Sequence, residues 1–145
     1  MLNMTIYLLE WIKREIYVPG KVENNVYIVN LKDISIFGVP FSLLKELGSV
    51  MEKNYRTKLF RLYVLNAPLT MTLLFSFFKN FDSNIQKKIF VTRKQSAAEM
   101  WEHISKEQLE QRFDGVCPNM KGDFWPPKPS SANVFISEED RLSYS

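Results

Sequence analysis

Cysteine and histidine are scarce in this chain, and their scarcity excludes several classes of protein. The 145 residues include one cysteine, Cys117, and one histidine, His103. A single cysteine cannot form a disulfide within the chain, and the two residues together cannot assemble a Cys/His zinc cluster. The sequence also lacks a phosphate-binding glycine loop, a dinucleotide-type glycine motif and any local support for a His-based catalytic triad. We therefore expect no metal, no cofactor and no enzymatic activity.

Long apolar runs are missing as well. A membrane-spanning helix needs about 20 consecutive apolar residues, and the most apolar stretch, residues 67–78, is well short of that. The start of the chain, MLNMTIYLLEWIKRE, has neither the basic region nor the small-residue cleavage site of a secretory signal. We therefore expect a cytoplasmic protein that is peripheral to membranes.

The residues that are present fit a globular protein with a bulky apolar interior or an apolar binding site. Apolar residues make up 46% of the chain and aromatic residues 14%, with 11 phenylalanines. The net charge of +3 is too small to indicate nucleic-acid binding, and the aromatic residues do not interleave with basic ones as in a stacking platform. The basic residues between 53 and 94 either contact an anionic membrane surface or form an ordinary solvated face.

The order of the hydrophobic patterns predicts an α/β fold. Apolar residues at helical spacing predict helices over residues 4–16 and about 40–53. Runs rich in β-branched and aromatic residues predict three strands: Asn25–Leu31, Leu59–Asn66 and Lys88–Thr92. Because apolar strands alternate with helices, we expect a mainly parallel sheet covered by helices.

Short capping motifs predict where further helices begin. Capping boxes that begin at Ser96 and Ser105 predict two more helices, the second of which ends near Gly115. Asp82 is interpreted as a helix cap rather than a catalytic acid.

Ligands of parallel sheets lie outside the carboxyl ends of the strands, which directs attention to Asn66-Ala67-Pro68.

A helix predicted over Thr70–Phe81 has almost no polar face. It follows the break at Asn66-Ala67-Pro68 and is apolar on every side. A helix of this kind must be buried or must contact lipid. One interpretation is a core helix that is buried all round, which is hard to arrange in so short a chain. The other is a helix with a ligand on one side and a membrane interface on the other.

Four blocks of the sequence resemble the CRAL-TRIO lipid-binding domains, in the family's order and spacing. They are VYIVNLKDISIFGVP, NYRTKLFRLYVLNAP, FFKNFDSNIQKKIFV and ISKEQLEQRFDGVC, and YLLEWIKREI fits the preceding helix. The departures are Arg56, Asn80 and Glu110 in place of prolines and Asp114 in place of the first of two glycines. The family's N-terminal lead-in and first strand have no counterpart, so the chain is a short form or another segment or partner supplies that edge.

The resemblance implies a CRAL-TRIO-like domain over residues 4–117, followed by a Pro/Ser-rich strap and a flexible tail over residues 118–145. It implies that the domain binds a phospholipid of the phosphatidylinositol type, or another hydrophobic ligand, in an apolar pocket. The helix after Asn-Ala-Pro would be a gate that closes the pocket and contacts a membrane during transfer. The alternative is a protein-interaction or regulatory module that transfers no lipid and has a protein partner.

The predicted lipid-binding residues come from the strands, the gate helix and the third block. They are Asn25, Tyr27, Val29, Leu62, Val64, Leu74, Phe75, Phe78 and Lys88. By the resemblance, Lys88 aligns with a lysine that contacts the inositol phosphate, for which an ammonium group is a suitable point charge. By the same resemblance, the polar positions that hold the headgroup in the family correspond to Ile85, Thr57, Asn25 and Tyr27 here, so the family's partners for the headgroup are mostly absent. The alternative for Lys88 is a solvated lysine at the end of a strand.

Overall fold

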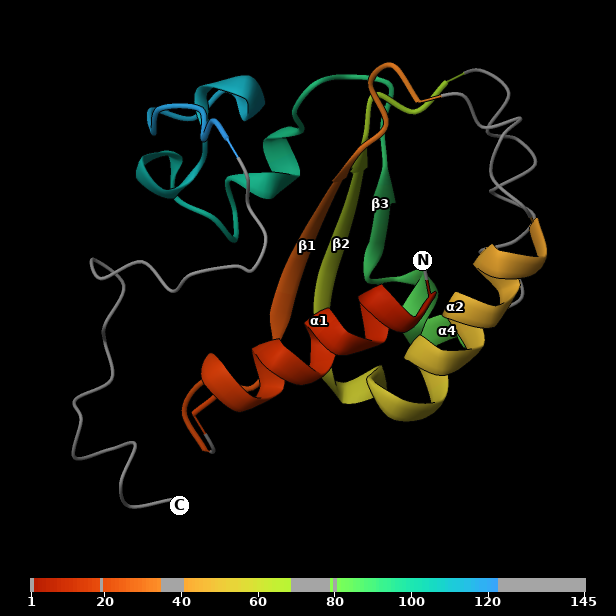
Figure 1. Cartoon of the computed structure of the whole chain (residues 1–145). Helices are drawn as coiled ribbons and strands as arrows, with labels where there is room; N and C mark the ends of the chain where they lie inside the picture. Colours follow the sequence, from red (N-terminus) through yellow and green to blue (C-terminus); the bar gives the residue numbers. More distant parts are fainter. Residues whose placement is uncertain (1, 19, 35–40, 69–78, 80, 123–145) are drawn as a thin grey trace. The chain divides into compact units, whose positions relative to one another are not determined.

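The computed structural model describes residues 2–18, 20–34, 41–68, 79 and 81–122 (Figure 1). These residues belong to two compact units. One unit holds the chain through Asn24 together with the chain from Lys121 onward, and the other holds Asn25–Met120. The predicted gate helix lies outside the described residues, apart from Lys79 and Phe81.

The first unit begins with helix α1, Leu2–Glu15, which confirms the helix predicted over residues 4–16. Leu9 is its buried residue. A tight turn follows, in which Val18 and Val22 form an isolated antiparallel bridge. Gly20 lies within this turn at a φ of 74°, a left-handed conformation that glycine adopts without steric strain.

The second unit is built on a sheet of three parallel strands in the order β1-β2-β3, all running in the same direction (Figure 1). The strands are β1, Asn25–Asn30, β2, Leu59–Leu65, and β3, Ile89–Val91. The connecting elements are helix α2, Phe41–Asn54, the 3-10 turn η2, Arg56–Lys58, and the short helix α4, Ser83–Gln86. The predicted parallel α/β sheet is thus confirmed, together with the helix expected at about 40–53.

Helix α4 was not predicted as a helix, but its cap was. The side chain of Asp82 accepts a hydrogen bond from the amide of Asn84 at 2.8 Å. This bond occupies one of the amide groups that the first turn of a helix leaves without a partner. The interpretation of Asp82 as a helix cap is confirmed.

The pairing of β1 with β2 contains one bulge. Asn25 lies opposite Leu59, whereas Val26 lies opposite Arg61, so Phe60 is an extra residue on β2. Both Phe60 and Arg61 contact His103: the Phe60 ring meets the imidazole edge-on, and Arg61 Nε lies 3.3 Å from His103 Nε2. The bulge therefore lets two consecutive residues of β2 reach the same neighbour.

Beyond the bulge, side chains alternate between the two faces of the sheet. One face carries Tyr63 and Leu65, which are 1% and 0% exposed. They form the main core together with residues from the segment after β3: Ala97, Met100 and Leu109. The Tyr63 hydroxyl donates to the carbonyl of Glu99 at 3.0 Å. The segment after β3 is therefore the layer that covers this face.

That segment differs from the two capped helices that the sequence predicts. It contains three 3-10 turns: η4, Ala98–Met100, η5, Lys106–Gln108, and η6, Gln111–Phe113. The N-cap of η4 is Ala97, and the hydroxyl of Ser96 donates instead to the carboxylate of Asp114. Ser105 does precede η5 but makes no side-chain capping bond. The capping-box prediction was wrong because a tertiary hydrogen bond and core contacts determine this conformation.

Candidate functional site

Five of the predicted lipid-binding residues lie on one face of the sheet, the face opposite the main core. We call it the ligand face, and its predicted members are Asn25, Tyr27, Val29, Leu62 and Val64. The three residues from β1 alternate along the strand and so share a face. Tyr27 lies beside Leu62, and Val29 lies beside Val64. The structure therefore brings these five residues together on one face of the sheet.

Two residues of β3 extend the ligand face and were not predicted. Leu62 lies opposite Ile89, and Val64 lies opposite Val91. Each row of the ligand face thus crosses all three strands, one through Leu62 and the other through Val64. The sequence places Ile89 and Val91 at alternate positions of a strand, but only the register shows which face they share.

The ligand face is most buried at its centre and most exposed at its outer strand. Val64 is 4% exposed and packs with Ala67 and with the partly buried Leu62 and Val91. Val29 on β1 is 41% exposed. An apolar surface that stays accessible on one side is the arrangement that a bound apolar chain can cover.

Polar groups lie at the end of the ligand face where the strands begin. The Asn25 amide Nδ2 donates to the hydroxyl of Tyr27 at 2.8 Å. Burial raises the pKa of Tyr27, and the hydrogen bond from Asn25 acts in the opposite direction. The phenol is therefore a neutral group whose oxygen is positioned by its neighbour.

Lys88 lies at the same amino edge of the sheet. Its Nζ donates to the carbonyl of Leu59 at 2.6 Å, and Leu59 is the residue that pairs with Asn25. An ammonium group has three donors, and this bond uses one of them. Lys88 is half-buried, whereas its neighbour Lys87 is exposed. The structure thus brings Lys88 near the start of both β1 and β2.

Thr57 and Ile85, which the resemblance aligns with headgroup contacts of the family, lie in different environments. Thr57 is exposed and lines a surface hollow together with residues from the end of α2: Glu52, Lys53 and Asn54. Ile85 is 7% exposed, so its apolar side chain contributes to the core rather than to a polar site. Among the described residues, none of the six predicted lipid-binding residues lines this hollow.

At the carboxyl edge of the sheet, to which the sequence directs attention, polar side chains bond to one another. Asn66, directly after β2, has a φ of 54°, and its Nδ2 donates to Asn30 Oδ1 at 2.8 Å. The same oxygen accepts from the amide of Lys32 at 2.9 Å. These polar groups bind one another and so hold the ends of β1 and β2 together. The predicted polar residues Asn25 and Lys88 are at the opposite edge.

Leu74, Phe75 and Phe78 were predicted to line the pocket from the gate helix. All three lie outside the described residues. Their place in the site stays a prediction.

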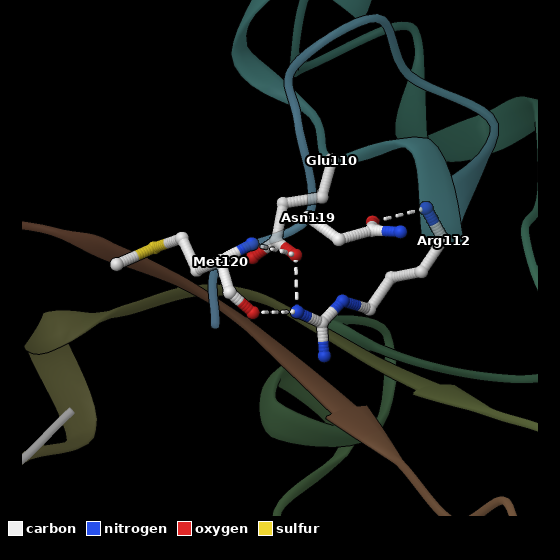
Figure 2. Close-up of polar contacts among 4 residues, drawn as sticks. All are labelled: Glu110, Arg112, Asn119 and Met120. Carbon is white, nitrogen blue, oxygen red and sulfur yellow. Dashed lines mark hydrogen bonds and ion pairs between the residues drawn. The ribbon is translucent and has the colours of Figure 1, made fainter. Parts of the chain in front are cut away.

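A polar cluster near the end of the second unit was not predicted (Figure 2). Arg112 Nη2 contacts Glu110 Oε2 at 2.5 Å and donates to the carbonyl of Met120 at 2.9 Å. The amide of Arg112 donates to Asn119 Oδ1 at 2.8 Å, and the amide of Met120 donates to Glu110 Oε2 at 3.2 Å. We call this set the Arg112 clasp. Its bonds hold residues 110 and 112 against residues 119 and 120. No sequence signal pairs these residues beyond their opposite charges.

Two departures from the family pattern take part in specific contacts. Glu110, in place of a proline, belongs to the Arg112 clasp. Asp114, in place of a glycine, has a φ of 59°, a region in which glycine is favoured and aspartate is tolerated. Its carboxylate accepts the hydrogen bond from the buried Ser96. The aspartate therefore keeps the backbone conformation of a glycine and adds a tertiary bond.

Comparisons with known proteins agree with this geometry. The family model of the CRAL/TRIO domain matches residues 1–115. Over 101 residues the chain is 26% identical to the Sec14 cytosolic factor of Schizosaccharomyces pombe (strain 972 / ATCC 24843). This match covers 68% of the chain and 35% of the relative, so the chain spans about a third of that protein's length. The described part of the chain contains no helix with the length and apolarity needed to cross a bilayer. The chain belongs to the CRAL/TRIO domain family.

Proposed function

We propose that the chain binds a phospholipid, or another ligand with an apolar tail, against the ligand face, and that it exchanges this ligand at membrane surfaces without catalysis. The observation that carries the proposal is the pair of rows through Leu62 and Val64, which cross three strands and have polar groups at one end. Burial of an acyl chain contributes about 0.8 kcal/mol per methylene, so ten buried methylenes contribute about 8 kcal/mol. That gain is comparable with the binding free energy of a micromolar ligand.

The headgroup would lie at the amino edge of the sheet. Lys88 is held there by its bond to the carbonyl of Leu59, the residue that pairs with Asn25, and Asn25 donates to the hydroxyl of Tyr27. A phosphate accepts hydrogen bonds from an ammonium group, and the interaction is strengthened by the low polarity of the adjoining face. This position favours a ligand with an anionic headgroup such as phosphatidylinositol.

The matched pair Lys88→Met and Lys87→Met tests the headgroup position. Each variant removes one positive charge, and the two residues are adjacent in the sequence. Lys87 is exposed, and we do not expect it to contact the ligand. We expect Lys88→Met to weaken capture of a fluorescent phosphatidylinositol at least fivefold and Lys87→Met to change it less than twofold. Equal effects of the two substitutions would show that only net charge matters. Thermal melts of both variants control for the lost bond to Leu59.

A second matched pair tests the ligand face. Val29 and Val116 are both exposed valines of the second unit, at 41% and 60%, but only Val29 belongs to the ligand face. We expect Val29→Asp to abolish retention of a fluorescent phospholipid, because a carboxylate would have to be buried against an acyl chain. Val116→Asp should retain it. If both variants bind lipid as well as the wild type, the ligand face is not the binding surface.

The apolar helix predicted over Thr70–Phe81 would close the ligand face and contact the membrane when the ligand is exchanged. A double substitution, Phe75→Asp with Phe78→Asp, should then abolish vesicle binding and lipid transfer together. The competing function is a protein-interaction module. In that case neither the wild type nor the variant would transfer lipid, and the variant would capture a different set of proteins from a lysate. We expect the protein in the cytoplasm, peripheral to membranes.

A further inference from the structure

The dipeptide Asp114-Gly115 joins two residues that react with each other in unstructured chains. Asp114 is the one aspartate of the sequence that a glycine follows. The backbone nitrogen after an aspartate can attack the carboxyl carbon of its side chain. Glycine favours this attack because it has no side chain to obstruct it and because its backbone is the most flexible. The native conformation around Asp114 therefore decides whether this chemistry takes place.

The reaction forms a cyclic imide and needs only water and protons. The nitrogen of Gly115 forms a bond to Asp114 Cγ, and one bond between Cγ and an oxygen breaks. The departing oxygen takes the amide proton and one proton from solvent, and leaves as water. Water then adds to one of the two imide carbonyls. Opening at Cγ restores aspartate, whereas opening at the backbone carbonyl yields isoaspartate, in which the main chain runs through Cβ and Cγ.

The backbone of Asp114 keeps the two reacting groups apart. Ring closure requires the nitrogen of Gly115 and the Cβ of Asp114 to eclipse each other about the Cα–C bond of Asp114. In an L-residue, the angle between these two atoms about that bond is ψ plus about 120°. Asp114 has a φ of 59° and a ψ of 27°, so its Cβ and the next nitrogen lie on nearly opposite sides of the bond. The imide cannot form until this backbone rotates.

Hydrogen bonds hold both reacting groups in this arrangement. The amide of Gly115 donates to the carbonyl of Glu110 at 3.1 Å. The carboxylate of Asp114 accepts from the hydroxyl of Ser96, a residue that is 9% exposed. Gly115 also lies too close to the backbone of Leu109 to move toward it. The attacking nitrogen and the carboxyl group are therefore bonded to different partners, and both bonds must break before the ring can close.

We propose that Asp114-Gly115 is a site of isoaspartate formation that the native fold keeps unreactive, and that it reacts when the segment after β3 opens from the main core. Segments of a folded protein open locally at free energies below that of global unfolding. When opening and closing are fast relative to a slow chemical step, the rate of that step follows the population of the open form. The proposal does not depend on lipid binding, so either proposal can fail while the other stands.

Isoaspartate would prevent the segment from returning to its native packing. The isomer has a longer main chain at the residue where Gly115 lies against Leu109. The next two amides bond back across the same place, Val116 to the carbonyl of Lys106 and Cys117 to the carbonyl of Leu109, both at 2.9 Å. A longer main chain shifts these amides away from their partners. Each isomerisation therefore leaves a permanent record of one opening of the segment.

The full chain, kept at neutral pH either folded or in urea, tests whether the fold suppresses the reaction. After trypsin digestion, Asp114 lies in the peptide 113–121, and chromatography separates the isoaspartyl form from the aspartyl form. Water enriched in heavy oxygen marks each ring that has opened. We expect isoaspartate to accumulate at least tenfold more slowly in the folded chain. Equal rates in the two states, or no isoaspartate in the unfolded chain, would overturn the proposal.

The matched pair Ser96→Ala and Ser105→Ala tests the bond that holds Asp114. Ser96 donates to Asp114, whereas Ser105 makes no side-chain capping bond and is exposed. We expect Ser96→Ala to speed isoaspartate formation in the folded chain about fivefold, the factor that corresponds to one ordinary hydrogen bond. Ser105→Ala should change the rate less than twofold. Circular dichroism confirms that both variants are folded, and equal rates for the two would overturn the role of the Ser96 bond.

Hydrogen exchange of the product tests its effect on the segment. The chain is isomerised in urea, returned to native conditions and compared with a chain refolded at once. The amides of Val116 and Cys117 should exchange at least tenfold faster in the isoaspartyl form, because their bonds to Lys106 and Leu109 are lost. The amide of Leu31, which bonds to Leu65 within the sheet, is the control and should stay protected. Unchanged exchange at Val116 and Cys117 would show that isoaspartate leaves the native packing intact and would contradict the proposal.

Discussion

Gly115 lies close against the backbone of Leu109, and Gly115→Ala tests how much this close approach contributes to stability. A Cβ atom at this position would overlap the backbone carbonyl group and the Cβ of Leu109. Leu109 is 3% exposed and belongs to the main core. Its carbonyl also accepts a hydrogen bond from the amide of Cys117 at 2.9 Å. The alanine can be accommodated only if the backbone of Leu109 moves.

The size of the effect follows from these contacts. Inserting a methyl group into a packed region costs about 1–3 kcal/mol. The shift also strains two backbone bonds, Cys117 to Leu109 and Val116 to Lys106, each of which contributes about 1 kcal/mol. We therefore expect a loss of about 3 kcal/mol in the free energy of unfolding. For a chain of this size, that loss lowers the melting temperature by roughly 10 °C.

The assay is urea unfolding followed by circular dichroism, with Gly20→Ala as the control. Gly20 has a φ of 74° but no heavy atom within 4 Å of a built Cβ. Its substitution should therefore cost only the left-handed backbone conformation, about 1 kcal/mol. If Gly115→Ala is as stable as the wild type within about 0.5 kcal/mol, the close approach of Leu109 does not hold this segment in place.

Three further substitutions test other contacts. Tyr27→Phe should lower stability by about 1 kcal/mol at neutral pH. Burial raises the pKa of Tyr27 in the folded protein, so the neutral phenol contributes stability that is fully present below the pKa of the unfolded chain. As the pH rises through the raised pKa, the wild type should lose stability more steeply than the variant in urea titrations, and parallel pH profiles would refute this. Ser96→Ala should cost about 1 kcal/mol in chemical unfolding by removing the donor to Asp114, and an unchanged midpoint would contradict that bond. Arg112→Met should cost less than about 1 kcal/mol because the ion pair is partly exposed, but should speed hydrogen exchange at the amide of Met120; unaltered exchange would show that the clasp does not hold this chain.

The strands could be predicted because their signal is local. Asn25–Asn30 and Leu59–Leu65 are runs of β-branched, aromatic and leucine residues, and their alternation with helices indicates a parallel sheet. The segment after β3 could not be predicted in the same way. The hydroxyl of Ser96 fits a capping box by sequence, but it bonds to Asp114, which is 18 residues away. A contact so distant in sequence leaves no periodic pattern.

The sequence indicates which residues of β1 share a face, but not which residues of β2 and β3 lie beside them on that face. Period-two alternation places Tyr27 and Val29 on one face, but a bulge at Phe60 shifts the register of β2 and decides which of its residues join them. The resemblance directed attention to Lys88, whereas its bond to the Leu59 carbonyl depends on how β3 lies beside β2. The side on which the polar groups gather is therefore a property of the folded sheet.

The most direct test of the central claim is native mass spectrometry of the full chain after incubation with vesicles that contain phosphatidylinositol and phosphatidylcholine. We predict a protein peak accompanied by a second peak at the added mass of one phospholipid per chain, and loss of the second peak in Val29→Asp but not in Val116→Asp. A protein that carries no lipid under these conditions, while remaining folded, would contradict the assignment of the ligand face as a lipid-binding surface.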